Sequence, residues 1–204
     1  MGEQAGSTKQ RILDVTEEFF KRNGYTGTGL KQVVEASNAP FGSIYHHFPG
    51  GKEQLGEAVI RRAGQMYYEL FETFLDLADD PVVGLRDFFA GAAVVLEQTG
   101  YIDPCPIGTV ALEKSSSSEV LRIACADVFE SWLTLATERL AKTGVSQAKA
   151  RDLAIVAVTG LQGGFMLSRA MRTTEAIEAV GVQVCAAVRA AIEDEGGGLA
   201  RPGV

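Results

Sequence analysis

The sequence predicts an all-α protein with about nine helices. Apolar residues recur three and four positions apart along most of the chain, which is the spacing of amphipathic helices. Capping residues such as Ser7 and Asp80, and breakers such as Asn23-Gly24 and Pro49-Gly50, separate these periodic segments. No segment shows the convincing alternation of a half-buried strand. We expect a small N-terminal domain at 6–55, a larger domain at 56–195 and a flexible tail at 196–204.

The first three predicted helices form a small bundle. Ser7 or Thr8 caps a helix that ends at Asn23-Gly24. A second helix follows the predicted N-cap Thr28 and stops near Asn38, which tolerates a left-handed backbone. The third helix is short, from Pro40 to His47. The residues expected in their shared core are Ile12, Leu13, Phe19, Phe20, Val33, Val34, Ile44 and Phe48.

Two short helices joined by a tight turn have the spacing of a helix-turn-helix, whose second helix enters the DNA major groove. Many helical hairpins share that spacing, so the pattern alone is a moderate signal. The sequence GSIYHHFPGGKEQL at 42–55 adds a more specific one. It resembles the end of the DNA-binding domain of the TetR family, and its FPGGK form resembles a drug-responsive and flavonoid-responsive subgroup. The run FFKRNGYTGTGLKQV at 19–33 is also typical of that family.

The resemblance implies which residues contact DNA. In the family, the third helix supplies base and phosphate contacts, the start of the second supplies a hydroxyl, and a lysine opening the fourth meets a phosphate. On the matching positions the predicted DNA-binding residues are Thr28, Phe41, Gly42, Ser43, Tyr45, His46 and Lys52. Phe41 departs from the pattern, because a polar or basic residue often stands there. It either weakens operator binding or touches a thymine methyl group. Tyr45 is equally compatible with core packing.

The following helices are longer. A helix from Lys52 to about Ala78 carries an apolar stripe at near-heptad spacing and would measure about 40 Å at ~1.5 Å per residue. Asp80 caps a helix that Pro81 begins. A loop at 100–108 precedes a short helix through Lys114, and Ser116 with Glu119 forms a capping-box pattern for the next, which ends at Gly144. Two further helices follow Ser146 and Thr174.

Aromatic residues concentrate on the middle helices. Each of them is more often a core residue than a ligand contact, but the TetR-like resemblance implies an inducer buried beside the fourth helix. The predicted ligand-binding residues are Met66, Tyr67, Phe71, Phe88, Phe89, Phe129, Trp132, Gln162, Phe165 and Met166. Few polar groups lie among them, which indicates an apolar or aromatic small molecule.

Small and apolar residues cover more than one face of the last two helices. Glycines there cost helix propensity, about 1 kcal/mol each relative to alanine, which close backbone approach would justify. We predict a homodimer that joins about residues 147–192 of each subunit in a four-helix bundle, as in the family. The alternative is a monomer in which these helices are wholly internal.

Charge and composition exclude other classes of function. The net charge is −7, but residues 1–55 hold six basic and six acidic residues, so the excess acid lies outside the DNA-binding domain. Two adjacent histidines and three scattered cysteines form no metal, disulfide or catalytic pattern. We therefore expect no enzyme activity, no cofactor and, without a stretch of about 20 apolar residues, a cytoplasmic protein.

These observations predict a ligand-responsive transcriptional regulator. The resemblance implies a repressor that an apolar or aromatic molecule releases from a palindromic operator. The alternative is a helical, small-molecule-binding dimer with weak or lost operator recognition, because Phe41 and a neutral head both argue for reduced DNA affinity.

Overall fold

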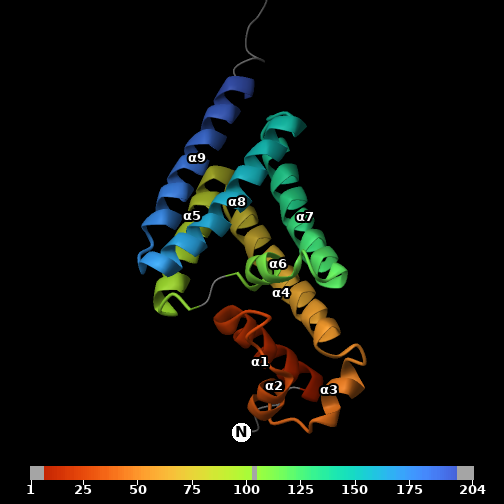
Figure 1. The fold of residues 1–204 in the computed structure, drawn as a ribbon. Helices are drawn as coiled ribbons and strands as arrows, with labels where there is room; N and C mark the ends of the chain where they lie inside the picture. Colours follow the sequence, from red (N-terminus) through yellow and green to blue (C-terminus); the bar gives the residue numbers. More distant parts are fainter. Residues whose placement is uncertain (1–6, 103–104, 197–204) are drawn as a thin grey trace, which may run out of the picture. The chain divides into compact units, whose positions relative to one another are not determined.

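A computed structural model describes residues 7–102 and 105–196 of the chain, and these fold into nine helices with no strand (Figure 1). The predicted all-α class is therefore confirmed. The predicted tail at 196–204 lies, apart from Gly196, outside the described residues, as does residue 6. The helices are α1 (Thr8–Asn23), α2 (Leu30–Ala36), α3 (Gly42–His47), α4 (Gly51–Leu77), α5 (Pro81–Gln98), α6 (Pro106–Lys114), α7 (Glu119–Ala141), α8 (Gln147–Met171) and α9 (Glu175–Gly196).

The chain divides into two compact units. The first, hereafter the head unit, contains residues up to Gln65 together with Asp103–Val128. The second, the body unit, contains Met66–Ile102 and the chain from Phe129 onward. Helices α4 and α7 each contribute to both units. The head unit thus includes α6 and the beginning of α7, which sequence spacing assigned to the other domain; the boundary at residue 55 itself stays a prediction.

The head unit has the core that periodicity predicts. Ile12, Phe20, Val33 and Ile44 are fully buried, and α1 packs closely against α2, α3 and α6. The side chain of Ser7 accepts a hydrogen bond from the backbone N–H of Gln10, which confirms it as the cap of α1.

The body unit is built on α9, which packs closely against α5 and α8. Two glycines of α8 make the second contact possible. A Cβ atom on Gly160 would lie 2.6 Å from the Val180 side chain, and one on Gly164 would lie 3.0 Å from that of Ile177. Close approach therefore explains these glycines, as predicted, but it occurs between helices of the same chain. A methyl group on Gly163 would meet no atom within 4 Å, so that position faces open space.

Several expectations about helix ends are wrong; α3, for example, begins at Gly42 and not at Pro40. Gly29, not Thr28, is the N-cap of α2. The cap before α7 is Ser118, whose hydroxyl accepts from the Leu121 N–H, and α7 ends at Ala141 instead of continuing to Gly144. These ends differ from the expected ones by one to three residues, an offset that spacing in the sequence does not resolve.

The apolar stripe predicted along α4 is not buried along its whole length. Leu55 and Val59 are buried, but Met66 and Leu70 are each 45% exposed and Phe71 and Leu75 are buried instead. The buried face shifts around the helix because α4 leaves one core and enters another at the boundary between the two units.

Helix α8 is the exception to the expectation that no segment is long and apolar enough to span a membrane. By length and composition alone it qualifies, with a window of mean hydropathy 1.3 of which only 22% is buried within the chain. The core helix of a non-membrane protein passes the same test, so length and composition alone do not identify a membrane span.

Candidate nucleic-acid interface

The turn between α2 and α3 is fixed by local hydrogen bonds. Asn38 adopts a left-handed conformation with φ of 48°, as its position predicts, and the Ala39 N–H donates to the Val34 carbonyl over 3.2 Å. From α1, the Arg11 Nε donates to the Ser37 carbonyl over 3.1 Å, which ties the turn to the first helix. The two short helices therefore meet at one defined angle, the arrangement of a helix-turn-helix.

Helix α3 separates an inner from an outer face. Ile44 is fully buried and Phe48 is 2% exposed, so both anchor the helix in the head core as predicted. Phe41 and Tyr45 lie outward, 53% and 52% exposed, with ring centroids 6.2 Å apart. Core packing of Tyr45, the alternative for this residue, does not occur.

The other predicted contacts on α3 share that outer face to different extents. His46 is exposed, and Ser43 is half-buried. A methyl group on Gly42 would meet no atom within 4 Å, so the backbone there is open to an approaching ligand. Five of the seven predicted DNA-binding residues are thus brought together on one short helix and its first turn.

The remaining two, Thr28 and Lys52, are placed differently. Thr28 is 1% exposed, and its hydroxyl donates to the Gly24 carbonyl over 2.7 Å. This side chain is therefore buried in the head unit and already hydrogen-bonded there. The Lys52 Nζ lies 4.4 Å from the centroid of the Tyr25 ring. Burial lowers the pKa of Lys52, and the positive Lys114 acts in the same direction while the Glu113 carboxylate opposes it. A ring contact leaves the ammonium charge available to a phosphate.

The loop at 24–28 has a partner that sequence reasoning missed. The Glu113 carboxylate, on α6, accepts a hydrogen bond from the Thr26 N–H over 2.7 Å. It occupies the space beside Gly24, where a Cβ would lie 1.8 Å from the Glu113 Oε1. Lys114, the next residue, lies 5.5 Å from the Tyr25 ring. No signal in the sequence pairs residues 87 positions apart, so the contact was not predictable.

Nine of the ten predicted ligand-binding residues fall into three groups within the body unit, and Met66 lies outside them. Phe71, Phe88 and Phe89 form one aromatic cluster, in which the Phe71 and Phe88 centroids are 4.7 Å apart. The second is Trp132 with Tyr67 and Phe129, at 6.2 Å and 5.6 Å in edge-on contact. The third lies on α8, where Phe165 packs against the core, Gln162 is half-buried and Met166 is 61% exposed. Met66 is also exposed, so these ten side chains do not converge on one site.

A small cavity of about 20 Å³ lies in the body unit beside the first aromatic cluster. That space suits a single water molecule, not an inducer. Its lining is apolar except for Arg139, whose guanidinium bonds to Asp76 and Glu72 at 2.9–3.0 Å. The residues that line it are Phe71, Leu75, Pro81, Leu85, Ala136, Arg139, Leu140, Leu153, Ala154, Ala157 and Val188. Of the predicted ligand set, only Phe71 is among them.

The cysteines behave as small buried side chains. Cys105 and Cys125 are buried, and Cys185 is partly so. Burial, together with the neighbouring Cys105, raises the pKa of Cys125 to about 11, which suppresses its thiolate. Across residues 7–102 and 105–196, no three side chains with metal-ligating groups come together.

Family models match both parts of the chain. Residues 12–59 match the model of bacterial regulatory proteins of the tetR family. Residues 81–183 match the C-terminal domain of LmrA/YxaF-like transcriptional regulators. The chain is 34% identical to the transcriptional regulator LmrA of Bacillus subtilis over 163 residues, which cover 80% of this chain and 87% of that protein.

Solved structures share the fold. A regulatory protein TetR from Rhodobacter sphaeroides superposes with a TM-score of 0.80 at 21% identity, over 89% of this chain and 99% of that one. A cysteine mutant of the TetR-family regulator CifR, bound to 26-bp double-stranded operator DNA, superposes with a TM-score of 0.73 at 21% identity, over 89% and 95% of the two chains.

Proposed function

Because this chain belongs to the TetR family of bacterial transcriptional regulators, we propose that it is a homodimeric repressor that a small apolar molecule releases from a palindromic operator. The family consists of transcriptional regulators that bind DNA, not of enzymes, and this much holds for the chain itself. Proteins of this kind are soluble, and we place this one in the cytoplasm, where its operator DNA lies.

The observation that carries the proposal is the division of α3 into two faces. Ile44 and Phe48 hold the helix from within, and its exposed face presents Phe41 and Tyr45. In our proposal this face enters the major groove, with Tyr45 and Ser43 donating hydroxyl hydrogen bonds to phosphates and His46 reaching base edges. Gly42 lets the backbone approach the DNA closely.

Lys52 and Thr28 have supporting roles in this proposal. Lys52 lies in the first turn of the 27-residue helix α4, where an ammonium group and a helix N-terminus both attract a phosphate. Thr28 reaches DNA only if its bond to the Gly24 carbonyl opens, so we assign it to holding the loop in place.

A homodimer through α8 and α9 is supported by apolar residues that the chain leaves uncovered. Val156 is 53% exposed, Leu167 47%, and Val182 64%. Exposed apolar residues on two packed helices are typical of an interaction surface, and the low burial of α8 fits a surface that a second copy covers. Gly160 and Gly164 give no support to the dimer, because both pack against α9 of the same chain.

Release by a small molecule can begin at the cavity of the body unit. The apolar cavity beside the first aromatic cluster holds about 20 Å³, so an inducer that enters there must displace side chains of α4, α7 and α8. The two aromatic clusters are the apolar surfaces that such a ligand would separate. Since α4 is one helix through both units, displacing its second half would bias the head and link ligand and operator reciprocally.

One observation favours the second function, a ligand-binding dimer without an operator. Phe41 exposes an apolar ring where the family often presents a polar or basic side chain, and the head has no net charge in its first 55 residues. Such a head would bind all DNA weakly.

Fluorescence anisotropy distinguishes the two functions. The purified chain is titrated onto its own upstream intergenic DNA and onto a scrambled duplex at two salt concentrations. A repressor binds the first duplex at least about a thousandfold more tightly, the low end for specific recognition. Equal, weak binding to both duplexes, and to a random pool of duplexes, contradicts the repressor and supports the second function.

A further inference from the structure

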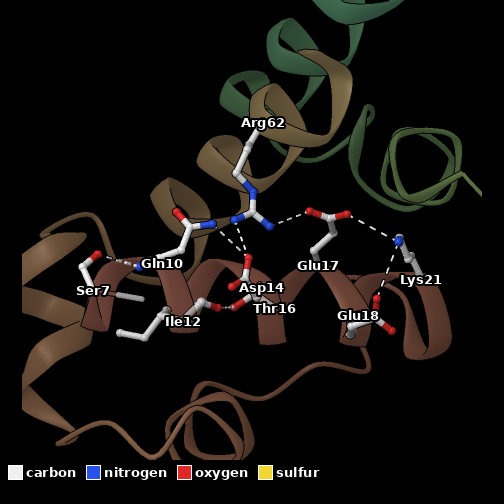
Figure 2. A network of polar contacts seen from close by, with 9 residues as sticks. All are labelled: Ser7, Gln10, Ile12, Asp14, Thr16, Glu17, Glu18, Lys21 and Arg62. Atoms are coloured by element: carbon white, nitrogen blue, oxygen red, sulfur yellow. Dashed lines mark hydrogen bonds and ion pairs between the residues drawn. The ribbon is translucent and has the colours of Figure 1, made fainter. Parts of the chain in front are cut away.

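A charged network joins α4 to α1 inside the head unit (Figure 2). The Arg62 Nη1 donates to the Asp14 Oδ1 over 2.6 Å, and its Nη2 donates to the Glu17 Oε2 over 2.8 Å. Asp14 and Glu17 are three residues apart on α1, so the guanidinium spans two positions on one face of that helix. Figure 2 shows Arg62 reaching down from α4 between the two carboxylates.

This network differs from an exposed surface pair. Glu17 and Lys21 are only 6% and 7% exposed, and the Lys21 Nζ lies 3.4 Å from the Glu17 Oε1. Glu17 therefore has a cation on each oxygen. Burial lowers the pKa of Arg62, but the hydrogen bonds to Glu17 and Asp14 outweigh that effect and leave the pKa raised. Losing Arg62 would leave a buried carboxylate with half of its compensation.

The network adds directional bonds between α4 and α1 to the apolar contacts that α4 makes in the head core. Leu55 and Val59 bury α4 in the head core, but apolar contact has no preferred direction and permits small rotations. A guanidinium held by two carboxylates fixes both distance and orientation. Arg62 thus restricts the rotation of α1 relative to α4.

The neighbouring Arg61 has the same chemistry and a different target. Its Nε donates to Glu57 of the same helix and its Nη1 donates to Asp127 of α7, at 2.9 Å and 3.0 Å. Neither partner lies on α1. Arg61 therefore provides an internal control for the loss of an arginine from α4.

We propose that Arg62 is a positioning residue for operator binding, which fixes α1, and with it α2 and α3, to the helix that continues into the body unit. This proposal rests on the proposed repressor function. Its consequence is specific: in a dimer, heads fixed to α4 can reach two half-sites only at one separation. Heads freed from α4 tolerate a changed separation.

The test measures this tolerance. A palindromic duplex is first selected from a random pool by the full-length wild-type protein, and a second duplex is made by inserting one base pair between its half-sites. We expect wild type to lose at least about tenfold in affinity on insertion, comparable to the cost of one mismatched base pair. Arg62→Met loses less than about threefold and binds the unmodified duplex more weakly than wild type. Arg61→Met keeps the wild-type ratio.

Two further variants keep the proposal testable if Arg62→Met does not fold. Asp14→Asn removes the exposed carboxylate and leaves Glu17 paired, and Arg62→Lys offers one ammonium in place of the fork; both give ratios between wild type and Arg62→Met. Folded Asp14→Asn, Arg62→Lys or Arg62→Met proteins with the wild-type ratio overturn the role of Arg62. Failure of the wild-type protein to enrich any duplex overturns the repressor function, and this outcome is visible before any variant is made.

Discussion

Gly24 offers a quantitative test of the contact between α6 and the loop that precedes α2. Its φ of 72° and ψ of 178° lie in a region that side chains rarely adopt, so Gly24→Ala should cost about 1–3 kcal/mol in backbone strain. The new Cβ would also lie 1.8 Å from the Glu113 Oε1. The carboxylate must move and gives up its bond to the Thr26 N–H.

The second cost is separable from the first. A charged hydrogen bond contributes about 1.5–3 kcal/mol, which we reduce to about 1–2 kcal/mol because this bond is open to solvent. Gly24→Ala should therefore cost about 2–5 kcal/mol in the wild-type background. In a Glu113→Ala background the bond is already lost, and the same substitution should cost only its strain, about 1–3 kcal/mol.

Hydrogen–deuterium exchange measures both costs as the local opening free energy of peptides that cover residues 20–30. The double-mutant cycle should give a coupling of about 1–2 kcal/mol, well above the ~0.3–0.5 kcal/mol scatter of independent sites. The Thr26 amide should lose protection in either single variant. Additive costs, or a Thr26 amide that stays protected in Glu113→Ala, would show that Glu113 does not hold this loop.

Three other substitutions or modifications test the remaining sites. Lys52→Met should weaken binding to all duplexes alike and reduce the salt dependence of anisotropy by about 0.9 per subunit, the value of one lost phosphate contact; an unchanged slope would exclude that contact. Val156→Asp should give monomers in sedimentation velocity, whereas Leu112→Asp, at the 85% exposed position on α6, should leave the dimer intact; dimers in both would place the interface elsewhere. Cys125 should resist thiol labelling at pH 8 until the protein unfolds, because its pKa of about 11 exceeds the ordinary 9.0. The unfolded chain loses this proton at a lower pH than the folded chain, so the free energy of unfolding should fall as pH rises above 9. Rapid labelling of the native protein at pH 8 would contradict the raised pKa.

The features that could be predicted from the sequence are those set by interactions between residues close together in the chain. Ser7 caps α1 and Asp80 caps α5 by accepting from backbone N–H groups two or three residues away. Asn38 turns left-handed where a helix must end. Such interactions are settled within a few residues, and the periodic spacing around Ile44 identified the inner face of α3 in the same way.

What could not be predicted depends on distant partners. Aromatic residues at helical spacing indicate burial, but not which neighbours they meet, and the structure divides Phe88 and Trp132 between two clusters. Small residues on α8 indicated close packing, but the partner of Gly164 is α9 of the same chain. The shift of the buried face along α4, from Val59 to Phe71, reflects two cores that no single helical repeat encodes.

The internal pairing of charges explains how a head unit whose first 55 residues carry no net charge can still be selective. Lys21 bonds to Glu17 and Glu18, Lys31 approaches Glu35 at 4.0 Å, and Arg62 is held by α1. Lys21 and Arg62 are held against carboxylates of α1, so they contribute little to the long-range attraction that draws any duplex to a basic surface, and the acid beside the exposed Lys31 offsets its charge. In the proposed complex, Lys52, whose Nζ lies 4.4 Å from the centroid of the Tyr25 ring, offers its charge to a phosphate. In the proposed dimer, such a head gains little from non-specific DNA, and its affinity comes from short-range contacts made by two heads at once. The geometry that sets their separation then matters more than their charge, which is why a single arginine between α4 and α1 should affect selectivity more strongly than its one charge would suggest.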